Sequence, residues 1–194
     1  MTRQATGPSR RGFLMLGGAA AASAAIMGLA GIAAPGGEHY GALLGGEVPQ
    51  VLSEKELAVL SVAAETLVGP IPGLPSIYET RTPARIDREL SLNRGALLSD
   101  MKASLLYLEY SPLMGTSLSR FSSMGVQERE AHLHALSRSE DPLERAIYNG
   151  VRFLVFFFYY TDPRTGAHLG YEGPQVPAKF FPAGNRIENL EALS

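Results

Sequence analysis

Residues 53–68 read SEKELAVLSVAAETLV, which is the pattern of an amphipathic helix. Ser53 and Glu56 have the spacing of a capping box, in which each side chain accepts a hydrogen bond from the backbone N–H of the other residue. Apolar residues then recur every three or four positions and share one face of the helix: Leu57, Leu60, Ala64 and Leu67. We therefore expect a helix over residues 54–68, near the start of a folded domain.

Toward the C-terminus, caps, prolines and periodic apolar residues predict further helices. Thr82-Pro83 and Asp141-Pro142 each place a capping side chain before a proline in the first helical turn. Ser111-Pro112 is expected to end the helix that precedes it. Four further helices are expected. The first begins at Thr82, the second covers residues 94–110, the third lies within residues 121–137, and the fourth runs from Asp141 to about Tyr160. No strand pattern stands out, so we expect an all-α domain over residues 51–194, a single helical bundle of about five helices.

The composition excludes several classes of protein. Hydrophobic residues make up 45% of the 194-residue chain and charged residues 19%, which are the proportions of a globular domain. Cysteine is absent, which excludes disulfide frameworks, iron–sulfur clusters, thiol nucleophiles and zinc–thiolate sites. The 17 basic and 19 acidic residues give a net charge of -2, so the basic excess typical of a nucleic-acid-binding protein is missing.

Residues 1–35 have the character of an export leader. They contain three arginines and no acidic residue, which leaves 14 basic and 19 acidic residues, a net charge of -5, for the rest of the chain. Ser9-Arg10-Arg11-Gly12-Phe13-Leu14, followed by a stretch rich in Ala and Gly, closely resembles a twin-arginine export signal. The resemblance implies that the twin-arginine translocase, which exports folded proteins, recognises Arg10, Arg11, Phe13 and Leu14.

Removal of this leader is left open by the sequence. Small residues near Ala30–Ala34 provide a cleavage site, which the following Pro35 and two glycines obscure. The 22 residues from Phe13 to Ala34 are long enough to span a bilayer core of about 30 Å, so retention as a signal anchor is the alternative. The low hydrophobicity of the leader favours cleavage. Residues 36–50 are rich in glycine and turn-forming residues and are interpreted as a linker.

The last predicted helix contains an aromatic cluster between Phe153 and Tyr160. The apolar segment around it, residues 151–160, has about half the number of residues needed to span a membrane, and Arg152 and Asn149 interrupt the apolar run. A helix that is apolar all round is expected at the centre of a bundle, and the alternative is that a partner protein covers part of its surface. From Thr161 onward, turn-forming residues predict an ordered loop without helix or strand.

The sequence contains no catalytic or cofactor-binding pattern. His132 and His134, beside Glu128 and Glu130, are the only cluster of potential metal ligands, but the two histidines lie about 200° apart around a helix. We expect this cluster to be a solvent-exposed helix face. The Gly-x-Ser-x-Gly motif of serine hydrolases and the glycine-rich loops of nucleotide-binding proteins are also missing. The chain is therefore predicted to be non-catalytic and to hold no cofactor of its own.

Three features together resemble the small, or gamma, subunit of gluconate 2-dehydrogenase, the family called gluconate 2-dehydrogenase subunit 3. They are the twin-arginine leader, the first helix beginning near Leu52, and a C-terminal pattern that is the most specific of the three. In that pattern an apolar helix runs into a tyrosine pair, a Thr-Asp-Pro turn and a Gly-Tyr-x-Gly-Pro loop: Tyr159-Tyr160, Thr161-Asp162-Pro163 and Gly170-Tyr171-Glu172-Gly173-Pro174.

The resemblance implies a partner, an FAD-dependent oxidoreductase of the glucose-methanol-choline type that oxidises a sugar or another alcohol. Such catalytic subunits commonly lack an export signal. The small subunit would then supply the signal, assist maturation and be exported with the folded flavoprotein. FAD is expected in the partner alone, and a cytochrome c subunit sometimes completes such a complex. The implied location is the periplasm or the outer face of the cytoplasmic membrane.

Large aromatic residues at the end of the last helix and in the following loop predict the partner-binding surface. The candidates are Phe157, Tyr160, Arg164 and Tyr171, because interface hot spots favour aromatic residues and arginine. The alternative is that Tyr160 and Tyr171 hold the loop on the bundle through packing and hydroxyl hydrogen bonds.

Two other functional classes stay open at this point. The first is a stand-alone exported enzyme or ligand-binding domain, with a pocket that contains Glu65, Glu109, His132 or His168. The second is a structural protein held at the membrane by its leader. A flavoprotein gene next to the gene for this chain would favour the subunit over both.

Overall fold

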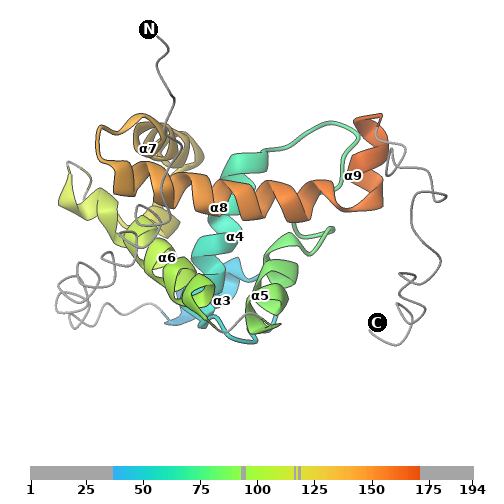
Figure 1. Ribbon diagram of the computed structural model, residues 1–194, viewed down its shortest axis with the longest axis horizontal. Helices are drawn as coiled ribbons and strands as arrows, with labels where there is room; N and C mark the ends of the chain where they lie inside the picture. The colour runs from blue at the N-terminus through green and yellow to red at the C-terminus, as the bar shows by residue number, and fades with distance from the viewer. Residues whose placement is uncertain (1–36, 93–94, 116, 118, 171–194) are drawn as a thin grey trace, which may run out of the picture.

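Helix α4 (Glu54–Val68) passes through the middle of the molecule, and the other helices pack around it (Figure 1). The computed structural model describes residues 37–92, 95–115, 117 and 119–170. Within these residues the chain forms seven α-helices, one short 3-10 helix and no strand, which confirms the all-α prediction. The other elements are α3 (Gly37–Leu43), α5 (Thr82–Leu92), α6 (Ala96–Met114), η2 (Phe121–Ser123), α7 (Val126–Arg138), α8 (Pro142–Tyr160) and α9 (Pro163–His168).

Helix α4 begins at the predicted capping box and is buried on all sides over its middle. Ser53 Oγ accepts the N–H of Glu56 at 3.3 Å, and the Glu56 carboxylate accepts the N–H of Ser53 at 2.7 Å. The consecutive residues 57–64 are all buried, because α3, α5, α6, α7 and α8 all pack against this helix. Half of these residues are alanine or serine, and small side chains let neighbouring helices approach closely.

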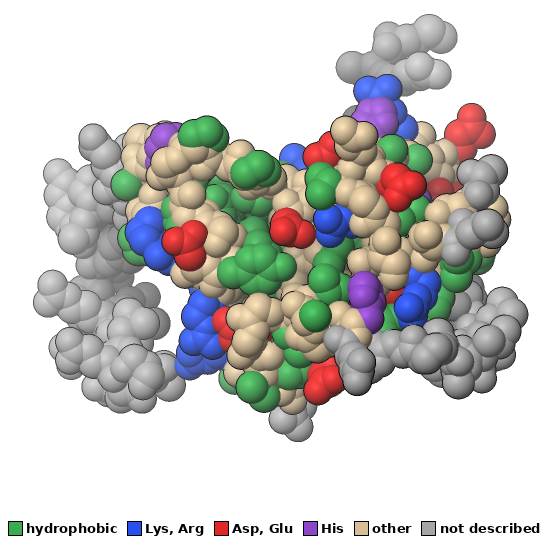
Figure 2. Space-filling model, turned by 180° about the vertical axis from the view of Figure 1, so that it is seen from behind, with side chains coloured by type: hydrophobic (Ala, Val, Ile, Leu, Met, Phe, Trp, Pro, Cys, Tyr) green, Lys and Arg blue, Asp and Glu red, His purple; other side chains and the backbone are tan. Residues whose placement is uncertain are grey.

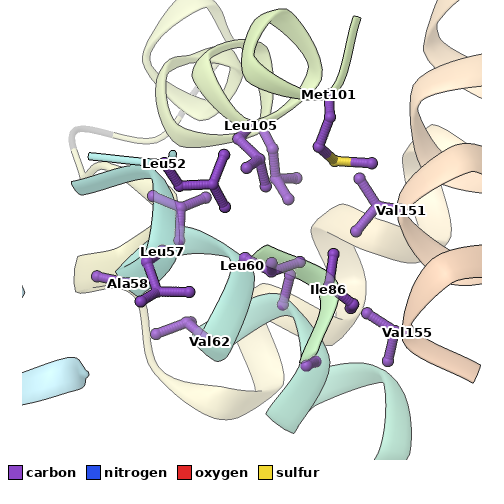
Figure 3. Close-up of a cluster of buried hydrophobic side chains, with 14 of the residues drawn as sticks. Leu52, Leu57, Ala58, Leu60, Val62, Ile86, Met101, Leu105, Val151 and Val155 are labelled. Atoms are coloured by element: carbon purple, nitrogen blue, oxygen red, sulfur yellow. The ribbon is translucent and has the colours of Figure 1, made fainter. Parts of the chain in front are cut away.

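The hydrophobic core surrounds α4, and Figure 3 shows side chains that several helices contribute to it. The labelled residues are no more than 5% exposed: Leu52, Leu57, Ala58, Leu60, Val62, Ile86, Met101, Leu105, Val151 and Val155. Burying a side chain of the size of valine or leucine contributes about 1.5–3 kcal/mol, so this cluster is a major source of stability.

Helix α8 does not occupy the centre, contrary to the prediction. It lies across α4 (Figure 1) and buries one face, formed by Ile147, Val151, Val155 and Tyr159. These residues are spaced four apart and therefore line one side of the helix. Tyr159 lies on this buried face, whereas Phe153 and Phe157 are exposed, so the aromatic cluster is divided between an inner and an outer face. In the described part of the chain, no helix is both long enough and apolar enough to cross a membrane.

Residues 36–50, expected to be a linker, instead contain helix α3, which packs against α4. Tyr40 of α3 is buried in the hydrophobic core. The backbone N–H groups of residues 50–52 all donate to the carboxylate of Asp87 in α5, at 2.5 to 3.2 Å. Gly45 allows the chain to turn back onto the domain. Its φ is 60°, a backbone conformation that favours glycine, and a Cβ atom at this position would lie 2.7 Å from the ring of Tyr78.

Helix α6 continues beyond its predicted end. Ser111-Pro112 is expected to stop it, but Pro112 lies within the helix, which ends at Met114. A proline inside a helix removes one backbone hydrogen bond and crowds the preceding turn. Both Ser111 and Pro112 are buried, so the packing of this last turn offsets the loss.

The turn after α8 also differs from the prediction, because residues 163–168 form the short helix α9 where a loop is expected. Asp162 caps α9 by accepting the N–H of Arg164 at 3.0 Å, and Pro163 occupies the first helical turn. This is the same local signal that starts α8 at Asp141-Pro142. Residues 171–194 lie outside the described part of the chain.

Candidate interaction surface on helix α8

Helix α8 is positioned by its N-terminal cap and by its inner face. Asp141 Oδ1 accepts the N–H of Leu143 at 2.8 Å, and Pro142 occupies the first turn. The inner face packs on α4, α5, α6 and α7. Because one side of the helix is committed to the core, the opposite side faces solvent.

The outer side of α8 exposes two phenylalanines. Phe153 is 64% exposed and Phe157 is 51% exposed, and their rings stack with centroids 5.9 Å apart. They are four residues apart and therefore form one apolar ridge along the helix. Among the described residues, they are the only aromatic side chains in the set of large exposed hydrophobic ones. Contiguous exposed apolar surface is typical of interaction sites, so this ridge is a candidate for one.

Gly150 precedes the two phenylalanines on the same side of the helix. It is exposed in the middle of α8, and a Cβ atom added there would meet no neighbouring atom. Glycine in a helix interior is about 1 kcal/mol less favourable than alanine, and no contact within the described chain requires it. We call Gly150, Phe153 and Phe157 the α8 stripe. Gly150 and Phe153 are not among the residues predicted from the sequence to bind a partner. Phe153 and Phe157 nevertheless follow Gly150 by three and seven residues, a spacing that places all three on one side of a helix.

The stripe has a mixed aromatic and basic border. The Arg152 guanidinium lies over the ring of Phe156, 5.0 Å from its centroid, and Phe156 contacts Tyr160 edge to face at 5.8 Å. Arg152 is exposed, and it forms no ion pair with any acidic residue that the structure describes. A positive charge is therefore available at the edge of the stripe.

Hydrogen bonds within the chain fix the turn from α8 to α9. The Tyr159 hydroxyl donates to the carbonyl of Pro75 at 2.8 Å. Arg164 pairs with Asp162 at 2.9 Å and donates to the carbonyl of Glu79 at 2.8 Å. The hydrogen bonds from Arg164 lower the pKa of the Asp162 carboxyl. The Thr-Asp-Pro turn therefore fastens α9 to the loop between α4 and α5.

The residues predicted to bind a partner lie in different environments. Phe157 is exposed on the α8 stripe. Tyr160 is half-buried and packs against the core. Arg164 has a 55% exposed side chain, but its guanidinium is used in the hydrogen bonds described above. The remaining predicted residues lie outside the described part of the chain: Tyr171 and the export-signal residues Arg10, Arg11, Phe13 and Leu14.

A buried carboxylate ties α3 and η2 to α6. Glu109 is 1% exposed and accepts the Tyr40 hydroxyl at 2.9 Å, the Ser122 N–H at 3.0 Å and the Ser122 hydroxyl at 2.7 Å. Arg120 donates to the Tyr40 hydroxyl at 2.9 Å, and its Nε lies 4.0 Å from the carboxylate. Burial and the neighbouring Glu109 carboxylate raise the pKa of Tyr40. Glu109 therefore holds α3 and η2 against α6 through hydrogen bonds.

His132 connects α7 to α6 at the edge of an open depression. Its Nε2 lies 2.9 Å from Ser111 Oγ, and its ring lies 6.0 Å from that of Phe121. Burial lowers the pKa of His132, and the Glu144 carboxylate partly opposes this shift. A serine beside a histidine is also the arrangement of a nucleophile and its general base. Ser111 is only 8% exposed, however, and it lies within α6, where backbone N–H groups are engaged in helical hydrogen bonds and unavailable to an oxyanion.

The other residues considered for a pocket do not join His132. Glu65 pairs with Arg129 at 3.4 Å, and His168 is exposed at the end of α9. Of the four candidates, only His132 lines the depression, together with Ser111, Pro112, Gly115, Ser117, Met124, Glu128 and Ala131. In the described residues, no group of three or more acidic and histidine side chains is placed to hold a metal ion.

The predicted histidine and glutamate cluster on α7 is largely exposed, with His132 the half-buried exception. Glu128 caps its own helix by accepting the N–H of Gly125 at 2.9 Å.

No family model, curated protein or solved structure matches this chain. Figure 2 shows the molecule from behind, where hydrophobic side chains are interspersed with acidic and basic ones. Among the described residues, the large exposed aromatic side chains lie on the α8 stripe.

Proposed function

We propose that this chain is a non-catalytic small subunit that binds, helps to mature and co-exports an FAD-dependent dehydrogenase of the glucose-methanol-choline type. The chain supplies the twin-arginine leader, and the flavoprotein supplies the catalytic site for oxidation of a sugar or another alcohol. The complex is located in the periplasm or on the outer face of the cytoplasmic membrane, with a cytochrome c subunit as a further partner.

The observation that carries this proposal is the α8 stripe. Phe153 and Phe157 expose apolar rings to water, and covering each ring would contribute about 1.5–3 kcal/mol. The stripe runs directly into Tyr159-Tyr160 and Thr161-Asp162-Pro163, the segment that resembles gluconate 2-dehydrogenase subunit 3. A surface suited to a protein partner and a motif typical of a dehydrogenase subunit therefore occupy the same part of the chain.

The leader provides a second support. A signal typical of folded export allows a partner that is already bound to leave the cytoplasm with this chain. Helix α3 begins at Gly37, just after the leader, and Tyr40 within it is buried. The leader is thus attached to a folded body that can hold a partner during export.

The polar residues inside the domain favour binding over catalysis. The Glu109 carboxylate accepts hydrogen bonds from Tyr40 and Ser122, and the His132 ring of α7 is hydrogen-bonded to Ser111 of α6. In this proposal FAD is held by the partner, and residues of this chain act by contacting the flavoprotein.

Purification of the tagged full-length chain from the exported fraction of its native cells tests the proposed function. A flavoprotein should co-purify, recognised by its flavin absorption spectrum and by alcohol-dependent reduction of a dye. The same chain produced alone should show neither flavin nor dehydrogenase activity. Recovery without any flavoprotein, or flavin bound to the chain alone, would contradict the proposal.

A further inference from the structure

We propose that the α8 stripe is the docking surface for the flavoprotein subunit, which covers the stripe with apolar side chains and places a carboxylate against Arg152. This inference rests on the proposed function and deepens it by naming the face that is used and the chemistry that meets it. Three features of α8 support it: the shape of the stripe, the charge at its border and the lack of a complementary charge on the same helix face.

The shape of the stripe suits a closely approaching partner. Gly150 has no side chain, and the space beside its Cα is open, so a partner backbone or helix can approach α8 at this point. Phe153 and Phe157 lie one and two turns further along, and their stacked rings form a ridge beside this gap. A gap next to a ridge provides the shape complementarity found at the centre of protein interfaces.

The charge at the border specifies the partner's chemistry. From Arg145 to Thr161 the sequence contains two basic residues and no acidic residue. Arg145 donates to the carbonyl of Ser139 and is half-buried, whereas Arg152 is exposed. Covering the stripe would remove water from Arg152, and a desolvated guanidinium requires acceptors, which a carboxylate provides in a two-point contact.

A second copy of this chain is a poorer match for the stripe. In a symmetric dimer the same patch meets itself. Stripe against stripe would bring Arg152 of each copy to a helix face with no acidic residue between positions 145 and 161. Charge complementarity therefore favours a different protein, and the proposed flavoprotein is the occupant.

Photocrosslinking of the full-length chain, expressed together with the flavoprotein, identifies the occupant directly. The change Phe153→p-benzoylphenylalanine places the photoreactive ring on the stripe, and the same change at Val126, a 55% exposed residue of α7, is the matched control. Light should join position 153 to the flavoprotein, giving a flavin-containing adduct with the summed mass of both chains. Position 126 should give no such adduct.

The strength of the contact is measured in parallel with serine variants. The double change Phe153→Ser with Phe157→Ser should weaken flavoprotein binding about 30-fold, as expected for a hot spot, and Arg152→Glu should weaken it about tenfold by setting two carboxylates against each other. Val126→Ser should leave binding unchanged. All these side chains are exposed, so the thermal unfolding midpoint of the isolated variants should stay within about 2 °C of the wild type.

Each other outcome overturns the inference in a recognisable way. A homodimeric adduct, or a link from position 153 to residues 171–194 of the same chain, would assign the stripe to a different occupant. Wild-type flavoprotein binding by the double serine variant would place the docking surface elsewhere and leave the proposed function standing. If the wild-type chain itself captures no flavoprotein, both the docking surface and the proposed function are wrong.

Discussion

Glu109 is a buried carboxylate at which α3, α6 and η2 meet. In Glu109→Gln the side chain keeps its size, but an NH₂ group replaces one acceptor oxygen and faces the donors on Tyr40 and Ser122. We expect the free energy of unfolding to fall by about 1–3 kcal/mol, because a buried donor is left without an acceptor. Urea denaturation measures this loss. Glu130→Gln on the exposed side of α7 is the control, and an equal effect of the two changes would argue against the network.

His132 carries a pH dependence whose direction follows from its environment. Burial lowers the pKa of His132 in the folded state, so the unfolded state binds a proton first as the pH falls below about 6.5. The free energy of unfolding should therefore decrease between about pH 7 and about pH 5. The lowered pKa values of Glu47, Glu144 and Asp162 act at lower pH, because carboxylates protonate there.

Unfolding curves of the wild type and of His132→Gln, recorded across this pH range, separate the histidine from the carboxylates. The variant should lose the decrease between about pH 7 and about pH 5 and keep the decrease at lower pH. Identical pH profiles for the two proteins would show that His132 does not contribute.

At the level of helices, α8 combines a core-forming face with an outer face that the other described residues leave exposed. Gly150 gives this element a test with two opposite outcomes. Gly150→Ala meets no neighbouring atom, so the isolated chain should gain about 0.5–1 kcal/mol of stability from better helix propensity. Binding of the flavoprotein should become weaker, because the added methyl group occupies the gap beside Phe153 and Phe157.

Calorimetric unfolding of the isolated chain and co-purification of the flavoprotein measure the two effects of Gly150→Ala. Gln127→Ala, an exposed change on α7, serves as the control and should leave binding unaltered. Gain of stability with unchanged binding would remove the close approach at Gly150 from the docking model.

For the molecule as a whole, export of both subunits should depend on one leader. Replacing Arg10 and Arg11 together with lysine should leave this chain and its flavoprotein in the cytoplasm, because the proposed complex has a single twin-arginine signal. Arg3→Lys changes an arginine outside the predicted pair and is the matched control. Immunoblots of cytoplasmic and exported fractions, with flavin measured in each, give the result. Continued export of the flavoprotein in the double lysine variant would show that it does not depend on this chain.

Features set by neighbouring residues were predictable from the sequence. The capping box of Ser53 and Glu56 and the Asp141-Pro142 start of α8 act within a single turn, and both helices have the predicted bounds. The all-α class follows from the same local periodicity. The Asp162-Pro163 start of α9 carried an equally local signal, which the loop prediction overlooked.

Burial depended on contacts between residues far apart in the chain. The apolar sequence of α8 predicted a central helix, but α4 takes that place because its small side chains let helices pack on every side. Segment 36–50 has the composition of a linker, yet Tyr40 reaches Glu109, 69 residues away, and holds α3 in the fold. The exposure of Phe153 and Phe157 was likewise hidden in a uniformly aromatic stretch. A side chain is exposed only where no other helix covers it. Which helix covers it depends on contacts between residues far apart in the chain, and local periodicity does not indicate these contacts.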